Sequence, residues 1–310
     1  NQHFSFRHLG AAVKKSVGFI MSWRTVIIST QSKLDYKMGY MVVRGKETHR
    51  IFLDEIAILL IENPMVSLTG CLVTALIEKK IRIVFCDEKR NPAAELTPHH
   101  GSHDSTAKIR MQAVWTAEVK ALVWREIVAD KIRKQANFLN ELGKEKEAEL
   151  LQTYISQIEP SDTTNREGHA AKVYFNALFG KDFTRGADNS INAALNYGYS
   201  LVLSAVNREI SNNGYLTQLG IFHNNMFNPY NLGCDLMEPL RVLVDRRVRK
   251  EMPLEFGKEE KHEMWRILED TVTIERYHQS LLNAIRIFVH SIFEALNDGD
   301  PSKVCFFEIE

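Results

Sequence analysis

Residues 98–104 read Pro-His-His-Gly-Ser-His-Asp, and this short polar stretch separates two parts of the sequence that have different patterns. Before it, β-branched and apolar residues form short runs, such as 56–61 and 81–86, with turn residues between them. After it, apolar residues recur every three or four positions, which is the spacing of an amphipathic helix. The sequence therefore predicts an α+β fold, with a small β-rich domain at residues 21–104 and a large all-α-helical domain at residues 105–310.

The expected helices follow one another through the second part of the chain. They span residues 105–142, 144–158, 164–179, 190–212, 233–250 after the proline of that segment, and 277–296. One further helix, at residues 67–80, is expected among the strands.

Charge and cysteine content narrow the class of protein. The chain of 310 residues carries 39 basic and 39 acidic residues, so its net charge gives no indication of a nucleic-acid partner. Its four cysteines lack metal-ligand spacing, which is typical of a reduced, cytosolic protein. No apolar run approaches the roughly 20 residues needed to span a membrane. Residues 1–20 precede Met21, and we expect them to be a non-native extension.

Two glutamates have a spacing that fits helix starts. Glu167 stands three residues after Thr164, and Glu238 stands three residues after Asp235. Both pairs fit a capping box, in which the first residue caps a helix and the glutamate bonds back to it. The pattern alone favours this role for both. It does not explain the polar residues that surround each glutamate, and it leaves His223 unexplained in an asparagine-rich loop.

A different chemistry follows if Glu167, His223 and Glu238 meet in the fold. Two carboxylates and one imidazole form an oxygen-rich site that favours Mg²⁺ or Mn²⁺ over Zn²⁺ and leaves room for phosphate oxygens. Neighbouring polar and basic side chains would then contact a DNA backbone. The candidates for this contact are Asn165, Arg166, His169, Arg241, Arg246 and Arg247.

Several common activities lack their motifs in this sequence. It contains no Walker loop, no dinucleotide-binding glycine motif, no nucleophile elbow and no HExxH zinc motif. The histidines of residues 98–104, together with Asp104, could bind a metal. A solvated loop between two domains is the favoured interpretation of that stretch.

Three stretches, in the order 165–171, 219–223 and 235–241, resemble the Cas1 family of CRISPR adaptation integrases. Residues 183–185 and 191–199 fit as well, and the likeness is strongest to members from type II systems, which have a single large effector nuclease. The resemblance covers about residues 21–296. It implies an N-terminal β-sandwich-like domain that supports dimerisation, a C-terminal α-helical domain that binds DNA and carries the catalytic site, and a homodimer.

The resemblance also implies an activity and its partners. The chain would be an endonuclease and integrase that joins the 3′-hydroxyl ends of captured DNA to the CRISPR repeat by metal-dependent transesterification. Glu167, His223 and Glu238 would bind Mg²⁺ or Mn²⁺, with Asp235 as the second choice for the third ligand. The implied partners are double-stranded DNA, a second copy of the chain, the Cas2 protein in a heterohexamer, and other adaptation proteins of the same system. The expected location is the cytoplasm of a prokaryote, without a membrane.

Two alternatives stay open at this point. The chain could be a general metal-dependent DNA nuclease or resolvase that uses the same residues with water as the nucleophile. It could also be a non-catalytic DNA-binding scaffold, in which both glutamates only cap helices.

Overall fold

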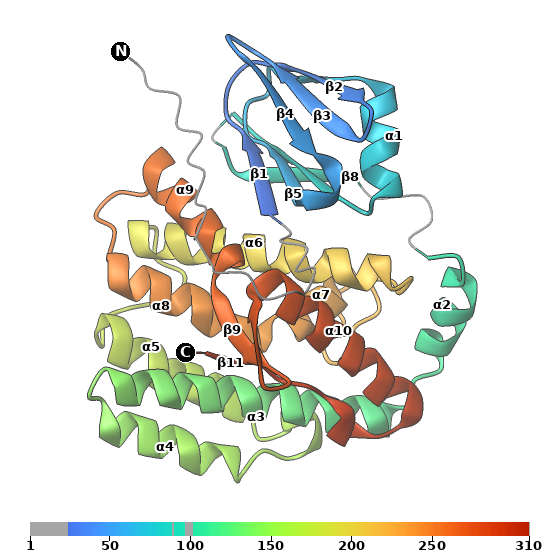
Figure 1. Cartoon of the computed structure of the whole chain (residues 1–310). Helices are drawn as coiled ribbons and strands as arrows, with labels where there is room; N and C mark the ends of the chain where they lie inside the picture. The colour runs from blue at the N-terminus through green and yellow to red at the C-terminus, as the bar shows by residue number, and fades with distance from the viewer. Residues whose placement is uncertain (1–23, 89, 97–101, 310) are drawn as a thin grey trace.

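The computed structural model describes residues 24–88, 90–96 and 102–309. A small part rich in β-strands lies above a larger part made mainly of helices (Figure 1). The expected extension at residues 1–20 lies outside the described residues, and the expected boundary at 98–104 is described only from Ser102 onward. In the described part of the chain, no helix is both long and apolar enough to cross a membrane.

The N-terminal part contains two four-stranded sheets. In the first, strand order is β1-β5-β7-β8; β1, β5 and β7 are parallel, and β8 is antiparallel to β7. In the second, strand order is β4-β3-β2-β6; the first two pairs are antiparallel, and β6 is parallel to β2. The bounds are β1 (Arg24–Ile28), β2 (Lys33–Lys37), β3 (Tyr40–Arg44), β4 (Thr48–Phe52), β5 (Ile56–Ile61), β6 (Ser67–Leu68), β7 (Arg82–Cys86) and β8 (Pro92–Leu96).

Both sheets share one core with helix α1 (Gly70–Glu78). Leu34 and Met41 from the second sheet meet Leu59 from the first sheet and Leu72 from α1 in a cluster of buried apolar side chains. Burial of this cluster removes apolar surface from water and holds the two sheets together. The predicted β-rich character of the N-terminal part is confirmed.

Strand β5 is buried on both faces, which accounts for its uninterrupted apolar sequence. Leu59 and Ile61 belong to the core of the N-terminal part, whereas Ile58 and Leu60 belong to the larger core formed with the helices. Alternate side chains of a strand point to opposite faces, so the parallel sheet is covered on both sides. Helix α6 (Ser190–Asn212) lies beneath this sheet (Figure 1).

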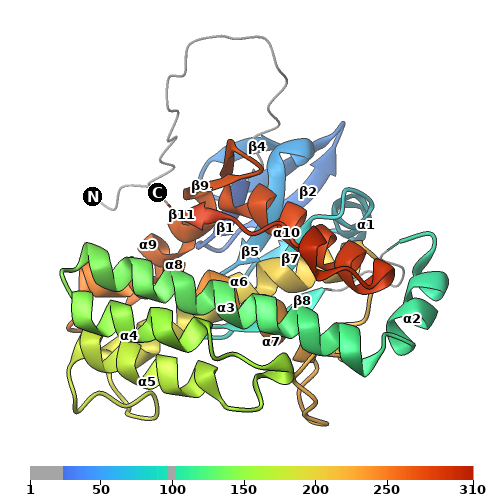
Figure 2. The same ribbon diagram turned by 90° about the horizontal axis from the view of Figure 1, so that it is seen from below.

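The helical part surrounds α6 and the long helix α3. Helices α3, α4 and α5 lie side by side on one side of the molecule, and α10 packs against α6 and α3 (Figure 2). The bounds are α2 (Ser105–Ala113), α3 (Ala117–Glu141), α4 (Glu145–Ile155), α5 (Arg166–Phe179), α7 (Asn231–Leu236), α8 (Arg241–Glu251), α9 (Lys258–Trp265) and α10 (Leu281–Asp298). Short 3₁₀ turns span Leu53–Glu55, Pro160–Asp162, Glu238–Leu240, Arg266–Glu269 and Pro301–Lys303.

The single helix predicted at residues 105–142 is two helices. Helix α2 ends at Ala113, and α3 begins at Ala117. Between them Thr116 is extended, and its hydroxyl accepts the N–H of Val119 at 3.2 Å. A threonine that caps a new helix start interrupts the apolar periodicity too briefly for the pattern alone to reveal it.

The prediction of an all-α-helical second part is wrong, because it contains a three-stranded antiparallel sheet. The strands are β9 (Thr271–Ile274), β10 (Tyr277–Ser280) and β11 (Glu308–Ile309), in the order β10-β9-β11. Glu275 and Arg276 join β9 to β10 with φ angles of 51° and 71°. Positive φ at both central residues is the conformation of two-residue hairpin turns, where glycine or asparagine is usual. Because neither residue occupies this turn, the sequence gives no sign of the hairpin.

Candidate active site

Helix α5 begins differently from the predicted capping box, and this leaves the Glu167 side chain available. Asn165 caps the helix by accepting a backbone N–H from three residues later at 3.3 Å. The buried carboxylate of Asp162 accepts the N–H groups of Arg166 and Glu167 at 2.8 and 2.9 Å. The capping box predicted for Thr164 and Glu167 is therefore wrong, because Asp162 and Asn165 satisfy the first amides of the helix.

The Glu167 carboxylate instead contacts a lysine on α3. Lys131 Nζ lies 2.5 Å from Glu167 Oε1 and 2.5 Å from Glu238 Oε2. Because both contacts share one nitrogen, the two carboxylate oxygens are at most twice that distance, 5.0 Å, apart. The side chains of Lys131 and Glu238 are 8% and 4% exposed, whereas that of Glu167 is 23% exposed. The site is therefore open to solvent on the Glu167 side.

A second cation holds Glu238, which begins the 3₁₀ turn that leads into α8. Arg241 Nε donates to Glu238 Oε1 at 2.9 Å, and its guanidinium carbon lies 4.6 Å from the ring centre of Tyr199. The Tyr199 hydroxyl donates to the buried carboxylate of Asp245. No side chain caps the turn at Glu238, so the capping box predicted with Asp235 is also wrong.

Asp235 lies in α7, and its carboxylate accepts hydrogen bonds from the loop that carries His223. Its Oδ2 accepts the N–H groups of Ile221 and Phe222 at 2.6 and 3.1 Å. Its Oδ1 accepts the N–H of His223 at 3.0 Å and lies 2.6 Å from His223 Nδ1. With Nδ1 donating to Asp235, Nε2 is the ring nitrogen that can bind a metal or accept a proton.

Aromatic contacts fix the position of the same loop. Phe222 stacks on the buried Trp124 of α3, with ring centres 4.5 Å apart and planes inclined by 3°. The His223 ring meets Trp124 edge-on, with 5.9 Å between ring centres and an angle of 87°. The His223 side chain is 38% exposed, so the imidazole is accessible to solvent.

The charges of the site work against the cost of burial. Burial alone would raise the pKa of Glu238, but its two bound cations outweigh that effect and lower the pKa to about 2. Burial lowers the pKa of Lys131, yet the charges of Glu238 and Glu167 leave it raised overall. The pKa of His223 is raised, first by its hydrogen bond to Asp235 and further by the charges of Glu238 and Glu167. The imidazole is thus within electrostatic reach of both glutamates.

The donor set suits a hard divalent metal, although an ammonium group stands between the carboxylates. Among the described residues, no three His, Cys, Asp or Glu side chains stand close enough together to hold a metal ion. The two glutamates nevertheless converge, and the imidazole of His223 is held through its other nitrogen. Carboxylate oxygens with one imidazole are ligands that Mg²⁺ and Mn²⁺ accept. Glu167, Glu238 and His223 are the residues that would hold such an ion.

The predicted DNA-contacting residues of α5 lie at the edge of this site. Asn165 and His169 are exposed, and Arg166 is half-buried. The Arg166 guanidinium carbon lies 5.6 Å from the ring centre of Tyr154, and the His169 ring centre lies 6.3 Å from the same ring. These side chains adjoin Glu167 in the first turn of the helix.

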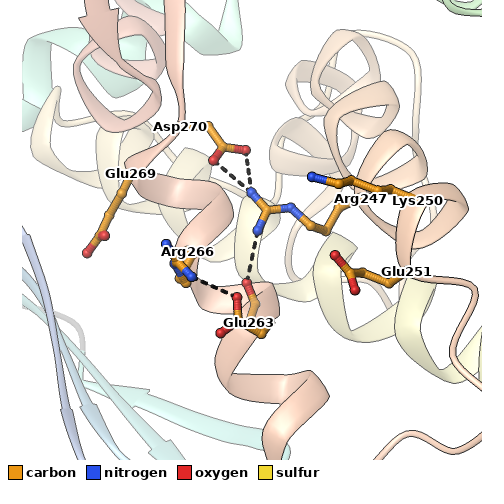
Figure 3. Close-up of a pocket in the computed structure, with 7 residues that line it drawn as sticks. All are labelled: Arg247, Lys250, Glu251, Glu263, Arg266, Glu269 and Asp270. Atoms are coloured by element: carbon orange, nitrogen blue, oxygen red, sulfur yellow. Dashed lines mark hydrogen bonds and ion pairs between the residues drawn. The ribbon is translucent and has the colours of Figure 1, made fainter. Parts of the chain in front are cut away.

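The arginines predicted on α8 already have acidic partners. Arg246 Nη1 lies 2.7 Å from Glu141 Oε2, and Arg247 Nη2 lies 2.7 Å from Asp270 Oδ1. Arg247 also lines a pocket of about 430 Å³, in which acidic and basic side chains of α8 and residues 263–270 face one another (Figure 3). The residues that line this pocket are not those that meet at Lys131.

Sequence reasoning missed Lys131, although the sequence contains a signal for it. Trp124, Val128, Lys131 and Gln135 recur at the spacing of one helix face, and all four are buried. A lysine is almost never fully buried without an anionic partner. A lysine at a core position of a long helix therefore indicates a buried carboxylate opposite it.

Comparison with known proteins identifies the family. The sequence model of the family described as "CRISPR associated protein Cas1" matches residues 25–254. A "CRISPR-associated endonuclease Cas1" from Neisseria meningitidis serogroup C is 34% identical over 295 residues, which are 93% of this chain and 97% of that protein. A relative from Francisella tularensis subsp. novicida is 28% identical over 240 residues, 70% of this chain and 75% of that protein. The chain belongs to the Cas1 family.

Solved structures share the fold. A Cas1 protein from Thermotoga maritima has a TM-score of 0.73 at 19% identity, covering 89% of this chain and 98% of that one. A structure described as "Casposase bound to integration product" has a TM-score of 0.73 at 16% identity, covering 90% and 93%. A chain of a "Cas6-RT-Cas1--Cas2 complex" has a TM-score of 0.70 at 16% identity. That match covers 94% of the present chain but only 37% of the other, longer chain.

Proposed function

We propose that this Cas1-family chain is a metal-dependent DNA integrase of CRISPR adaptation, which joins the 3′-hydroxyl ends of a captured DNA fragment to the CRISPR repeat. The observation that carries the proposal is the convergence of Glu167 and Glu238 on one buried point, beside His223. These are the residues that the family resemblance implies as ligands, and they come from three separate segments of the chain. Convergence of the two glutamate carboxylates is what a metal site requires and what two helix caps do not.

Glu238 is the better candidate than Asp235 for the third ligand. The Asp235 oxygens are engaged with three backbone N–H groups and His223 Nδ1. Glu238 instead places a carboxylate oxygen on the same Lys131 ammonium that Glu167 contacts. We assign Asp235 the role of orienting the imidazole, as carboxylates commonly do for metal-binding histidines.

The proposed reaction is a transesterification. The 3′ oxygen of the captured DNA forms a bond to a repeat phosphorus, the bond from that phosphorus to the 3′ oxygen of the repeat strand breaks, and the attacking hydroxyl's proton ends on the leaving oxygen. One phosphodiester replaces another, so no external energy source is needed. A bound divalent ion would supply Lewis-acid stabilisation of the phosphate charge. Asn165, Arg166 and His169 would orient the DNA backbone at the edge of the site.

We also propose that the chain works as a homodimer with Cas2 in a heterohexamer, together with other adaptation proteins. Support comes from the likeness in fold to chains of structures described as Cas6-RT-Cas1--Cas2 complexes, a description that names Cas2 as a component. Mass photometry of the chain mixed with the Cas2 protein of its own system tests this. A mass matching four copies of the chain and two of Cas2 is expected, and unchanged separate masses would contradict it.

A strand-joining assay tests the reaction. Duplex fragments with 3′-hydroxyl ends and matched fragments with 3′-dideoxy ends are incubated with the chain, Mn²⁺ and a labelled leader–repeat duplex. We expect joined product only from the hydroxyl ends, because the hydroxyl is the nucleophile. Equal product from the dideoxy ends would refute the proposed mechanism.

A nuclease or resolvase is the second candidate, because the curated relatives are called endonucleases. In that case water is the nucleophile, and branched DNA is cut equally well whatever the fragment ends carry. The same gel separates cleaved from joined strands. The scaffold alternative rested on both glutamates being caps, and neither of them is one.

A further inference from the structure

A buried ammonium group occupies the centre of the candidate site. Lys131 Nζ contacts one oxygen of Glu167 and one of Glu238, each at 2.5 Å. It reaches them from α3, whereas the glutamates come from the start of α5 and the turn before α8. Three elements far apart in sequence therefore meet at this nitrogen.

Electrostatics explains why a cation is needed at this point. Two carboxylates whose oxygens are at most 5.0 Å apart repel one another, and burial strengthens the repulsion because water screens it less. One ammonium group offsets one of the two negative charges. Six-coordinate Mg²⁺ places its oxygen ligands roughly 3 to 4 Å apart, since metal–oxygen distances are about 2.0–2.1 Å. The ammonium nitrogen and a divalent ion would thus need nearly the same place.

We propose that Lys131 is a built-in counter-cation that holds Glu167 and Glu238 together without metal and is displaced when a divalent ion binds. This inference rests on the proposed metal-dependent function. Lys131 acts through the two glutamates, so it is a positioning residue for the metal. Displacing Lys131 costs part of the free energy of metal binding. The site therefore binds metal more weakly than the two carboxylates would without the lysine.

Lys131 is the cation that moves, because the second one is fixed. The Arg241 guanidinium carbon lies 4.6 Å from the ring centre of Tyr199, and Arg241 Nε donates at 2.9 Å to Glu238 Oε1, the oxygen that does not contact Lys131. Lysine carries a compact charge on a flexible four-carbon stem, whereas arginine is a planar group that gains from stacking. A change of side-chain rotamer can therefore withdraw the ammonium of Lys131 while Arg241 keeps Glu238 in place.

The test is direct titration of the metal-free chain with MnCl₂ by calorimetry. Lys131→Met keeps the length of the side chain and removes its charge. We expect this variant to bind Mn²⁺ about tenfold tighter or more than the unmodified chain, because one competing positive charge is gone. We also expect its Tm without metal to fall, and Mn²⁺ to raise that Tm more than it raises the Tm of the unmodified chain.

The chain offers a matched control three residues further along the same helix. Lys134 is also buried, but its charged neighbours are Asp130, Arg133 and Glu308, not the glutamates of the site. Lys134→Met should lower the Tm, since it leaves the buried Asp130 with Arg133 as its one remaining cationic partner. It should leave the Mn²⁺ affinity unchanged. Lys131→Arg, which keeps the charge, should retain the weaker affinity of the unmodified chain.

Two results of the titration and joining experiments would overturn the inference. In the first, Lys131→Met binds Mn²⁺ no more tightly than the unmodified chain, and joining by the unmodified chain still requires metal. This result would refute the role of Lys131 but leave the proposed function standing. The other is metal-independent joining with no Mn²⁺ binding to either protein, which removes the function as well. If Lys131→Met fails to fold, a crystal structure of the unmodified chain with Mn²⁺ decides. Lys131 Nζ is expected to have left both carboxylates, and continued contact with both would refute its displacement.

Discussion

Asp245 is a buried carboxyl group behind the candidate site. It accepts a hydrogen bond from Tyr199, whose ring supports the arginine bound to Glu238. Burial raises the pKa of Asp245 from its ordinary value of 3.8 to about 6, although its hydrogen bonds and nearby cations act in the opposite direction. The folded chain therefore holds this proton more tightly than the unfolded chain does.

This shift predicts how one substitution changes stability with pH. The contribution of Asp245 to the free energy of unfolding is fully present below pH 3.8 and is lost as the pH rises through about 6. The loss amounts to about 3 kcal/mol over this range. Relative to Asp245→Asn, which does not titrate, the unmodified chain should lose stability mainly between about pH 4 and pH 6 and change little above about pH 7. Urea unfolding of both proteins at several pH values measures this loss. A difference in unfolding free energy that does not change with pH would contradict the raised pKa of Asp245. Asp182→Asn, at an exposed position, is the control.

Single residues also mark where sequence reasoning succeeded and failed. The spacing of Thr164 and Glu167 fitted a capping box, but Asp162, two residues before Thr164, takes the first helix amides instead. Capping patterns are local, so two candidates close in sequence cannot be ranked without the backbone conformation. Asn165 has a φ of 53°, a left-handed conformation that moves the helix start by one residue. Lys131 was missed for another reason, since its partners are remote in sequence.

The loop that carries His223 depends on one glycine. A Cβ atom at Gly220 would collide with the backbone oxygen of His223 and lie 2.8 Å from Asp235 Oδ2. The backbone oxygen cannot move aside as a flexible side chain could. Asp235 holds this loop through three N–H groups, so a displacement here shifts the imidazole.

Gly220→Ala should therefore impair catalysis more than stability. We expect strand joining to slow by roughly a hundredfold, because small displacements of a reacting group have effects of that size. Gly186→Ala is the matched control, since nothing lies within 4 Å of a Cβ atom there. Joining rates and Tm values of both variants test this. Equal rates for Gly220→Ala and the unmodified chain would show that the loop does not fix His223.

Regular elements with strong periodicity could be predicted from sequence, and irregular ones could not. The buried strand at residues 56–61 and the helix closed by Gly180 appear as expected, because apolar periodicity and a glycine end are direct signals. The break at Thr116 and the β9–β10 hairpin were missed. Both rely on backbone conformations of one or two residues, which tertiary contacts select.

At the scale of the whole molecule, β5 ties the two parts together. Its alternate side chains enter both cores, so neither part can lose this strand without exposing apolar surface of the other. Polar contacts add to the junction: Ser204 of α6 donates to Glu95 at 2.5 Å, and Arg208 donates to the carbonyl of Lys80 at 3.3 Å. The sequence predicted that β5 is buried, but a continuous apolar run cannot show which two layers cover it.

The shared strand predicts cooperative unfolding. Leu60→Ala removes a fully buried side chain on the face toward the helices and should cost 2 to 5 kcal/mol, roughly the range for leucine truncation in a core. Differential scanning calorimetry should show one transition, shifted to lower temperature. Two separate transitions, with only one of them shifted, would show that the parts unfold independently. The exposed Met65→Ala should leave the curve unchanged.

The central claim is that Glu167 is a working carboxylate of a DNA-joining site and not a helix cap. The most direct measurement is strand joining by Glu167→Gln in Mn²⁺, with its Tm recorded beside the unmodified chain and the exposed Glu145→Gln as control. We predict that joining falls by about a hundredfold or more while the Tm stays close to that of the unmodified chain, because Asp162 and Asn165 still cap the helix. Full joining activity with a lowered Tm would contradict the account.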